Sequence, residues 1–310
     1  MERVLNVGVP QTAGRQPRLP VLELCSEDTG AGKTQLLYYI IAKMVLPDRH
    51  NSTALEGKNG AVVFFDTDGR FDVQRLLQIM TSHIASRVSE EDSIADTQEL
   101  IERSLQHVHV FQPRSLDGLL GTLEGLKKYL FDTTAHFSSN RAVHGLFIDS
   151  ASAFYWETRA DFENDRLTAL NAKAPGASTA AMPPPKPNPY TLLINRLRSL
   201  QQTLNCAVIA TSTASRFKDA ATGEQSIRTL PAPWPSFPTT RLIVRREQVR
   251  KFAMGIAWED AERDKLLRQD AVEKAQFVAN SLHGGEGFRF AITRNGVRMM
   301  EKEAEGEMEP

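Results

Sequence analysis

The sequence has few cysteines, no long apolar run and almost no net charge. Its only two cysteines, Cys25 and Cys206, lie in apolar, strand-like runs without the spacing of a metal site. We therefore expect core thiols in a reducing, intracellular compartment. No run of about 18 apolar residues occurs, and the N-terminal MERVLNVGVPQ lacks the apolar centre of a secretory signal. These absences predict neither a membrane span nor secretion. The formal net charge of −1 provides no global basic field, so DNA contact would need a local patch.

Short, continuous apolar runs alternate with segments of helical periodicity. Buried strands are predicted at residues 21–25, 61–65, 143–148 and 206–210, with a further candidate at 108–111. Helices are predicted at residues 35–46, 71–87, 115–131 and 190–204. This alternation predicts an α/β fold with a mainly parallel central sheet flanked by helices on both faces.

The C-terminal part reads differently. Residues 215–238 are predicted as a long loop, and residues 240–244 and 288–293 as antiparallel edge strands. Asn295-Gly296 is the turn signal of a C-terminal antiparallel hairpin.

The predicted organisation is one domain over residues 21–300. Residues 1–20 are expected to be a flexible lead-in, and residues 301–310 a solvated acidic tail. Residues 172–189 are rich in alanine and proline and cannot build a packed core, so we expect an extended or disordered insertion.

The segment CSEDTGAGKT (25–34) is typical of a phosphate-binding loop. It lies between a predicted strand and a predicted helix, where backbone N–H groups and the helix N-terminus bind phosphate. Lys33 is the candidate to reach the β- and γ-phosphates, and Thr34 the candidate for Mg²⁺. Glu27 stands where the full motif has a third glycine, and it either repels phosphate or points outward. The candidate cofactor-binding residues of this loop are Gly30, Ala31, Gly32, Lys33, Thr34 and Gln35.

Polar residues follow three other predicted strands. Asp149 ends the strand at 143–148, where a second Mg²⁺-supporting carboxylate is expected. Asp68 follows the strand at 61–65 and is a candidate to orient a water for hydrolysis, although a helix-capping turn is an equal alternative. Thr213, in a Thr-Ser-Thr run after the fourth strand, is a candidate γ-phosphate sensor, with an ordinary polar strand end as the alternative.

A basic run near residue 245 is the candidate DNA contact. Arg241, Arg245 and Arg246 could neutralise DNA phosphates, or they could form a solvated hairpin face. Trp156 and Trp234 lie near loops and are either interface anchors or packing residues.

Taken together, these motifs resemble RecA-type eukaryotic recombinase paralogues. The resemblance is carried by GAGKT (30–34), FFDTDGRFD (64–72), LFIDSASAFYW (146–156), AVIATST (207–213), LPAPWPSFPTTRLIV (230–244) and FAITRNGV (290–297). It covers roughly residues 20–300. GAGKT is generic to phosphate-binding loops, whereas DSASAFYW is specific.

The resemblance implies a RecA-like P-loop NTPase core that binds ATP and Mg²⁺. By position, Lys33 and Thr34 would bind phosphate and magnesium, and Asp149 would be the second magnesium-site carboxylate. Asp68 would replace the catalytic glutamate and Thr213 the sensing glutamine. We therefore expect slow hydrolysis or none, with at most a weak DNA-stimulated ATPase.

The family implies a nuclear accessory subunit in homologous recombination. Its partners would be other recombinase-paralogue subunits and, through the complex, single-stranded or branched DNA.

Two other functions remain open. A P-loop phosphotransferase acting on a small molecule would need an arginine-rich lid, and the loop at 215–238 has only Arg216 and Arg228. A scaffold that has lost nucleotide binding is favoured by Glu27 and opposed by the intact Lys33, Thr34 and Asp149.

Overall fold

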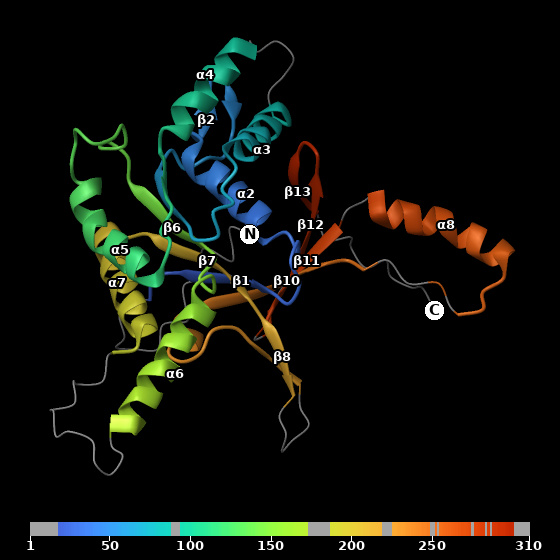
Figure 1. Ribbon diagram of the computed structural model, residues 1–310. Helices are drawn as coiled ribbons and strands as arrows, with labels where there is room; N and C mark the ends of the chain where they lie inside the picture. The colour runs from blue at the N-terminus through green and yellow to red at the C-terminus, as the bar shows by residue number, and fades with distance from the viewer. Residues whose placement is uncertain are drawn as a thin grey trace.

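The fold is built on one nine-stranded sheet with the order β13-β12-β11-β10-β1-β7-β6-β4-β5 (Figure 1). The computed structural model describes residues 18–87, 94–172, 187–218, 225–248, 252, 254–273, 276–282, 284–285 and 287–300. The strands of the sheet are β1 (Val21–Ser26), β4 (Ala61–Asp66), β5 (Val108–Phe111), β6 (Val143–Asp149), β7 (Ala207–Thr213), β10 (Thr240–Arg246), β11 (Gln276–Ser281), β12 (Phe288–Thr293) and β13 (Gly296–Met300).

The sheet has a parallel part and an antiparallel part that meet at β10. Strands β5, β4, β6, β7, β1 and β10 are parallel to their neighbours, whereas β10–β11, β11–β12 and β12–β13 pair antiparallel. The predicted mainly parallel sheet and the C-terminal hairpin are therefore confirmed.

Two strands predicted at an edge lie inside the sheet. The strand at 288–293, β12, is antiparallel as predicted but lies between β11 and β13. β10 was predicted as an antiparallel edge strand, but it pairs parallel with β1 on one side and antiparallel with β11 on the other. Leu242 and Val244 are buried because the strand is covered on both edges and packs in the core.

Helices cover both faces of the sheet (Figure 1). The covering helices are α2 (Lys33–Val45), α3 (Val73–Ala85), α4 (Ile94–Leu105), α5 (Leu116–Leu130) and α7 (Pro189–Leu204), whereas α6 (Tyr155–Ala172) and α8 (Trp258–Glu273) extend away from the sheet. Neighbouring residues of a strand point to opposite faces, so Phe64 packs with α2, α3 and α4, whereas Phe65 packs with α5 and α7. Because both faces of the sheet are covered by apolar cores, successive residues of these strands are all apolar.

Several elements were not predicted. The supposed loop at 215–238 contains the hairpin of β8 (Ser215–Lys218) and β9 (Gln225–Arg228), followed by the 3-10 turn η1 (Trp234–Ser236). Helices α4, α6 and α8, strand β11, and the short pair β2 (Arg49–His50) and β3 (Thr53–Ala54) were also missed.

Some sequence-based predictions lie outside the described residues. They concern most of the lead-in, residues 173–186 of the insertion, and the tail at 301–310. Within the described chain, no helix combines the length and apolarity needed to cross a membrane.

Both cysteines are buried and unpaired, as predicted. Burial raises the thiol pKa of Cys25 and of Cys206 to about 12, so neither is a reactive thiolate near neutral pH.

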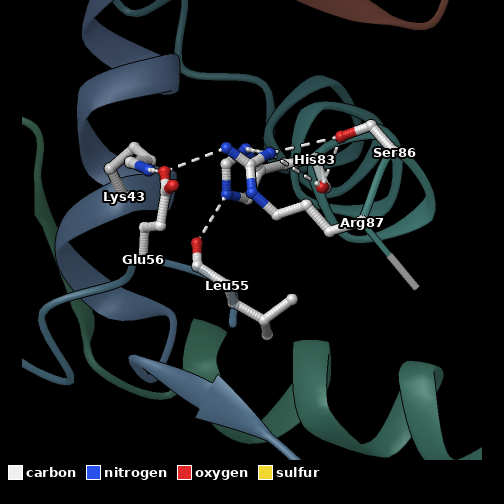
Figure 2. Close-up of polar contacts among 6 residues, drawn as sticks. All are labelled: Lys43, Leu55, Glu56, His83, Ser86 and Arg87. Atoms are coloured by element: carbon white, nitrogen blue, oxygen red, sulfur yellow. Dashed lines mark hydrogen bonds and ion pairs between the residues drawn. The ribbon is translucent and has the colours of Figure 1, made fainter. Parts of the chain in front are cut away.

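A buried histidine joins α3 to the segment between β3 and β4 (Figure 2). His83 Nε2 donates to the carbonyl oxygen of Leu55 at 2.9 Å, and Nδ1 accepts from Arg87 at 3.2 Å. Glu56 receives hydrogen bonds from both Lys43 and Arg87. Burial, with the nearby Arg87 and Lys43, lowers the pKa of His83 to about 4.

We expect His83 to make stability fall with acidification. As pH drops below the ordinary histidine pKa of about 6.5, the unfolded chain binds a proton that folded His83 does not bind until about pH 4. The free energy of unfolding should lose about 1–2 kcal/mol between pH 7 and pH 5 through this group.

Urea midpoints of the wild type and of His83→Asn at pH 7 and pH 5 measure how much of the loss in unfolding free energy comes from His83. His107 and His109 carry similarly lowered pKa values of about 4 and remain in the variant. An equal pH-dependent loss in both proteins would contradict the role of His83.

Candidate nucleotide-binding site

The loop between β1 and α2 has the backbone of a phosphate-binding loop. Gly30 and Gly32 have φ angles of +75° and +90°, which side-chain-bearing residues rarely adopt. Gly32 is the N-cap of α2. Because glycine has no side chain, it cannot cap the first N–H groups of the helix. These N–H groups and the positive end of the helix dipole therefore favour an anion at this point.

The C-terminal strands lie against this loop. A Cβ atom at Gly32 would be 2.7 Å from Cδ1 of Ile292 and 3.2 Å from Cδ1 of Phe277. The φ angle is what favours glycine at this position, and a side chain here would in addition have to displace Ile292. Sequence reasoning missed both apolar neighbours, because β11 was not predicted and the position of β12 beside the loop is set by the sheet order.

Asp149, the last residue of β6, faces Thr34 in the first turn of α2. Thr34 Oγ1 donates to Asp149 Oδ2 at 2.7 Å, and Thr211 Oγ1 donates to the other carboxylate oxygen. Burial raises the pKa of Asp149, while the two hydroxyl donors and Lys33 oppose that rise. A hydroxyl and a carboxylate are hard oxygen donors, so the pair fits Mg²⁺, which prefers such ligands with water and phosphate oxygens.

Lys33 is held beside this pair. Its ammonium donates to the hydroxyl of Ser26, the last residue of β1. Burial lowers the pKa of Lys33, and Asp149 is the largest influence in the opposite direction. A cation in this position can meet the negative charge of a bound phosphate.

These groups share one cavity of about 510 Å³. It is lined by Thr29, Gly30, Ala31, Gly32, Lys33, Thr34, Gln35, Asp68, Arg70, Arg75, Asp149, Ser150, Thr211, Thr213, Phe277 and Ile292. The volume is within the usual range of about 300–1,000 Å³ for small-molecule and cofactor sites. Every candidate cofactor, metal and catalytic residue from the sequence is therefore at this cavity.

Asp68, Thr213 and Gln35 each interact with another group at or near the cavity. Burial, followed by the charge of Asp149, raises the pKa of Asp68. The backbone N–H of Thr213 donates to Ser152 Oγ at 3.0 Å, and the residue is exposed at the end of β7. Gln35 accepts a 2.7 Å hydrogen bond from Arg75.

Arg75 was not anticipated. It reaches from α3 to the carbonyl oxygens of Thr293 and Arg294 at 2.8 Å each, and so links α3, α2 and the C-terminal hairpin at the edge of the cavity. No local pattern distinguishes this arginine from an ordinary exposed residue of α3.

Glu27 points away from the cavity into a pair of arginines. Its carboxylate oxygen Oε1 accepts a hydrogen bond from Arg245 Nη2 at 3.0 Å, and the other oxygen forms an ion pair with Arg216 of β8. Two cations therefore balance the one acid that departs from the glycine pattern. Of the two orientations considered for Glu27, the structure has the outward one.

The candidate DNA-contact arginines divide into two groups. Arg241 is buried, with a side chain only 8% exposed, and forms an ion pair with the fully buried Glu23. The prediction that Arg241 contacts DNA is therefore wrong, because its guanidinium is inside the protein. Arg245 and Arg246 lie toward the exposed end of β10, although Arg245 is paired with Glu27.

No protein-family model matches the chain. Mouse DNA repair protein XRCC2 is 32% identical over 130 residues, which are 42% of this chain and 39% of that protein. Mouse DNA repair protein RAD51 homolog 2 is 31% identical over 99 residues, or 32% of this chain and 25% of that protein.

An archaeal protein is also similar. DNA repair and recombination protein RadA from Methanoculleus marisnigri is 27% identical over 126 residues, or 41% of this chain and 34% of RadA. The chain thus spans less than half the length of each of these relatives. The similarity agrees with the sheet order and the glycine loop: the chain has a RecA-like α/β fold and resembles RecA-type recombinase paralogues.

Proposed function

We propose that this chain is an ATP-binding accessory subunit of a recombinase-paralogue complex in the nucleus. It acts in homologous-recombination repair of double-strand breaks and stalled forks by assisting the recombinase filament on single-stranded DNA. The observation that carries the proposal is the convergence of Lys33, Thr34 and Asp149 on one cavity beside the glycine loop. The similarity to three DNA repair proteins supports the recombination role.

The proposed nucleotide chemistry divides among the residues of the cavity. Lys33 and the N–H groups at the start of α2 bind the phosphates, and Gly30 and Gly32 keep the backbone close to them. Thr34 and Asp149 hold Mg²⁺, directly or through water. When bound, Mg²⁺ neutralises phosphate charge.

We propose that hydrolysis is slow. Asp68 lines the cavity, but its side chain is one methylene shorter than that of glutamate. Thr213 also lines the cavity, but it lacks the side-chain amide by which a glutamine would reach a γ-phosphate. Asp68 is then the candidate to orient water, in an ATPase that DNA stimulates weakly at most.

DNA contact is proposed through the complex, with Arg245 and Arg246 as this chain's contribution. Both extend from the exposed end of β10. Arg245 contacts Glu27 of the phosphate-binding loop, so a DNA contact there would lie next to the nucleotide.

One reconstitution separates this function from its two alternatives. The full chain is co-expressed with RecA-type paralogue subunits, purified, and exposed to a photoreactive ATP analogue with Mg²⁺ or with EDTA. We expect a stable hetero-oligomer in which this chain is labelled only when Mg²⁺ is present. A complex without labelling of this chain would indicate a scaffold. A monomer that transfers phosphate to a small molecule would indicate the phosphotransferase.

A further inference from the structure

Helix α6 has almost no packing partner in the described chain. From Trp156 to Thr168 no side chain is buried, and only Thr158 is partly covered. Its far end points away from the rest of the fold (Figure 1). Helices in proteins are stabilised mainly by burying an apolar face, so a solvated helix of this length is weakly stabilised by itself. Its described ion pair, Arg166 with Glu163 at 3.9 Å, adds little.

Large apolar groups are nevertheless present on α6. The exposed fraction is 70% for Trp156, 42% for Phe162 and 55% for Leu167. Aromatic side chains of this kind are enriched at protein interfaces. Apart from Arg159, which lies 5.7 Å from the centre of the Trp156 ring, the described residues leave much of this apolar surface uncovered.

A cavity of about 290 Å³ lies beside α6, between it and the starts of α5 and α7. Its apolar lining includes Leu116, Leu120, Phe162 and Leu192. The volume is at the lower limit of about 300 Å³ for small-molecule pockets, so it suits a side chain of a partner better than a free ligand.

A second cavity of about 260 Å³ lies between α6, the start of α7 and the segment at Pro231 and Ala232. Thr158 and Phe162 line both cavities. The second cavity is also lined by Tyr190, whose buried hydroxyl has no hydrogen-bond partner among the residues that the structure describes. Buried hydroxyls are normally paired, so the orphan hydroxyl marks incomplete packing along this face.

The first cavity is acidic. Its lining includes the carboxylates of Asp117, Glu157, Asp161 and Asp165, and none of its described lining residues is lysine or arginine. Such a field repels the phosphates of DNA and of anionic lipids, and attracts cationic side chains. Charge complementarity therefore favours a basic protein segment.

We propose that α6 and these two cavities form a docking surface for a partner protein segment that carries lysine or arginine around an apolar anchor. The anchor enters the cavity lined by Leu116, Leu120 and Phe162, and the flanking cations meet Glu157 and Asp161. Docking covers Phe162, which lines both cavities, and stabilises α6. The proposal does not depend on nucleotide binding.

The test uses a synthetic helical peptide of leucine and lysine as the probe with the full chain. We expect the peptide to bind and hydrogen exchange in α6 to slow, while a leucine–glutamate peptide and single-stranded oligothymidine do neither. Asp161→Lys should weaken binding by at least about tenfold, because it places a cation against the peptide's cations.

Glu163→Lys is the matched control, because it makes the same charge change on the same helix at a residue that lines neither cavity. It should change affinity by less than about twofold. The milder Glu157→Gln should weaken binding if Asp161→Lys unfolds the chain, and Phe162→Ser should do so through the apolar contact. No binding of the peptide, or equal losses in Glu163→Lys and Asp161→Lys, would overturn the proposal. Oligothymidine binding that protects α6 would point to DNA instead.

Discussion

Replacing Glu23 with alanine is expected to cost about 3–5 kcal/mol of unfolding free energy. Glu23 has no solvent exposure and accepts hydrogen bonds from Ser212 Oγ at 2.6 Å and Trp234 Nε1 at 2.9 Å. Its second oxygen pairs with Arg241, its neighbour across the parallel β1–β10 pair. The variant would leave Arg241 as a buried cation without its carboxylate and would remove the acceptor of two further donors. Each of these changes is costly in an interior site.

A matched comparison isolates burial from charge. Glu56 also has two cationic partners, Lys43 and Arg87, but its side chain is 60% exposed. Glu56→Ala should therefore cost no more than about 1 kcal/mol. Urea midpoints for the two variants, at unchanged m values, measure the difference. Similar losses would show that the Glu23 network is not a buried ion pair in solution.

The double variant Glu23→Leu with Arg241→Met tests the same network if the single variant does not fold. Removing both charges together leaves no uncompensated ion, so the double variant should be more stable than Glu23→Ala. A double variant no more stable than the single one would mean that packing, not charge compensation, dominates at this site.

The ion pair between Glu23 and Arg241 shows why the burial of Arg241 could not be predicted from the sequence. A run of arginines reads as a surface patch, because nothing local distinguishes an arginine that faces solvent from one that faces a distant carboxylate. Glu23 was nevertheless a usable signal. It interrupts the apolar run of β1, and an acid in a buried strand needs a partner. The partner itself could not be named, because β1 and β10 are far apart in the chain: Cys25 and Leu242, which are in contact, are separated by 217 residues.

The strands were predicted well where sequence is decisive. The β4, β5 and β6 runs are apolar and are bounded by polar residues, so their ends were placed within one residue. The direction of β10 was not readable, since an apolar strand looks alike in a parallel or an antiparallel pair. Helix α6 was missed for another reason. Its aromatic and acidic residues are spread around the helix, so it has no periodic apolar face.

The candidate site follows from a simpler rule. Residues after parallel strands meet at one edge of the sheet, so the positions of Thr34 and Asp149 after two such strands are enough to expect them close together. Arg75 could not be expected there, because its place depends on how α3 packs between α2 and the C-terminal hairpin. That arrangement is tertiary and has no signature in local sequence.

Lys33→Ala is expected to weaken binding of a fluorescent ATP analogue by about 10- to 100-fold. The lysine lies beside the glycine loop in the 510 Å³ cavity, where its charge also acts on Asp149. A hydrogen bond to a charged group contributes about 1.5–3 kcal/mol, which corresponds to this range. Because Lys33 also offsets the buried charge of Asp149, the urea midpoint of the variant is measured alongside, and affinities are compared for folded protein.

Lys43→Ala is the matched control for this experiment. Lys43 is on the same helix but bonds to Glu56 outside the cavity, so its removal makes the same charge change without touching the site. It should leave the affinity unchanged, and EDTA should weaken binding to the wild type through the loss of Mg²⁺ at Thr34 and Asp149. If Lys33→Ala and Lys43→Ala bind the analogue equally, the cavity beside the glycine loop does not hold the phosphates. The nucleotide role proposed for Lys33, Thr34 and Asp149 would then be untenable, even if the chain still assembles with recombinase paralogues.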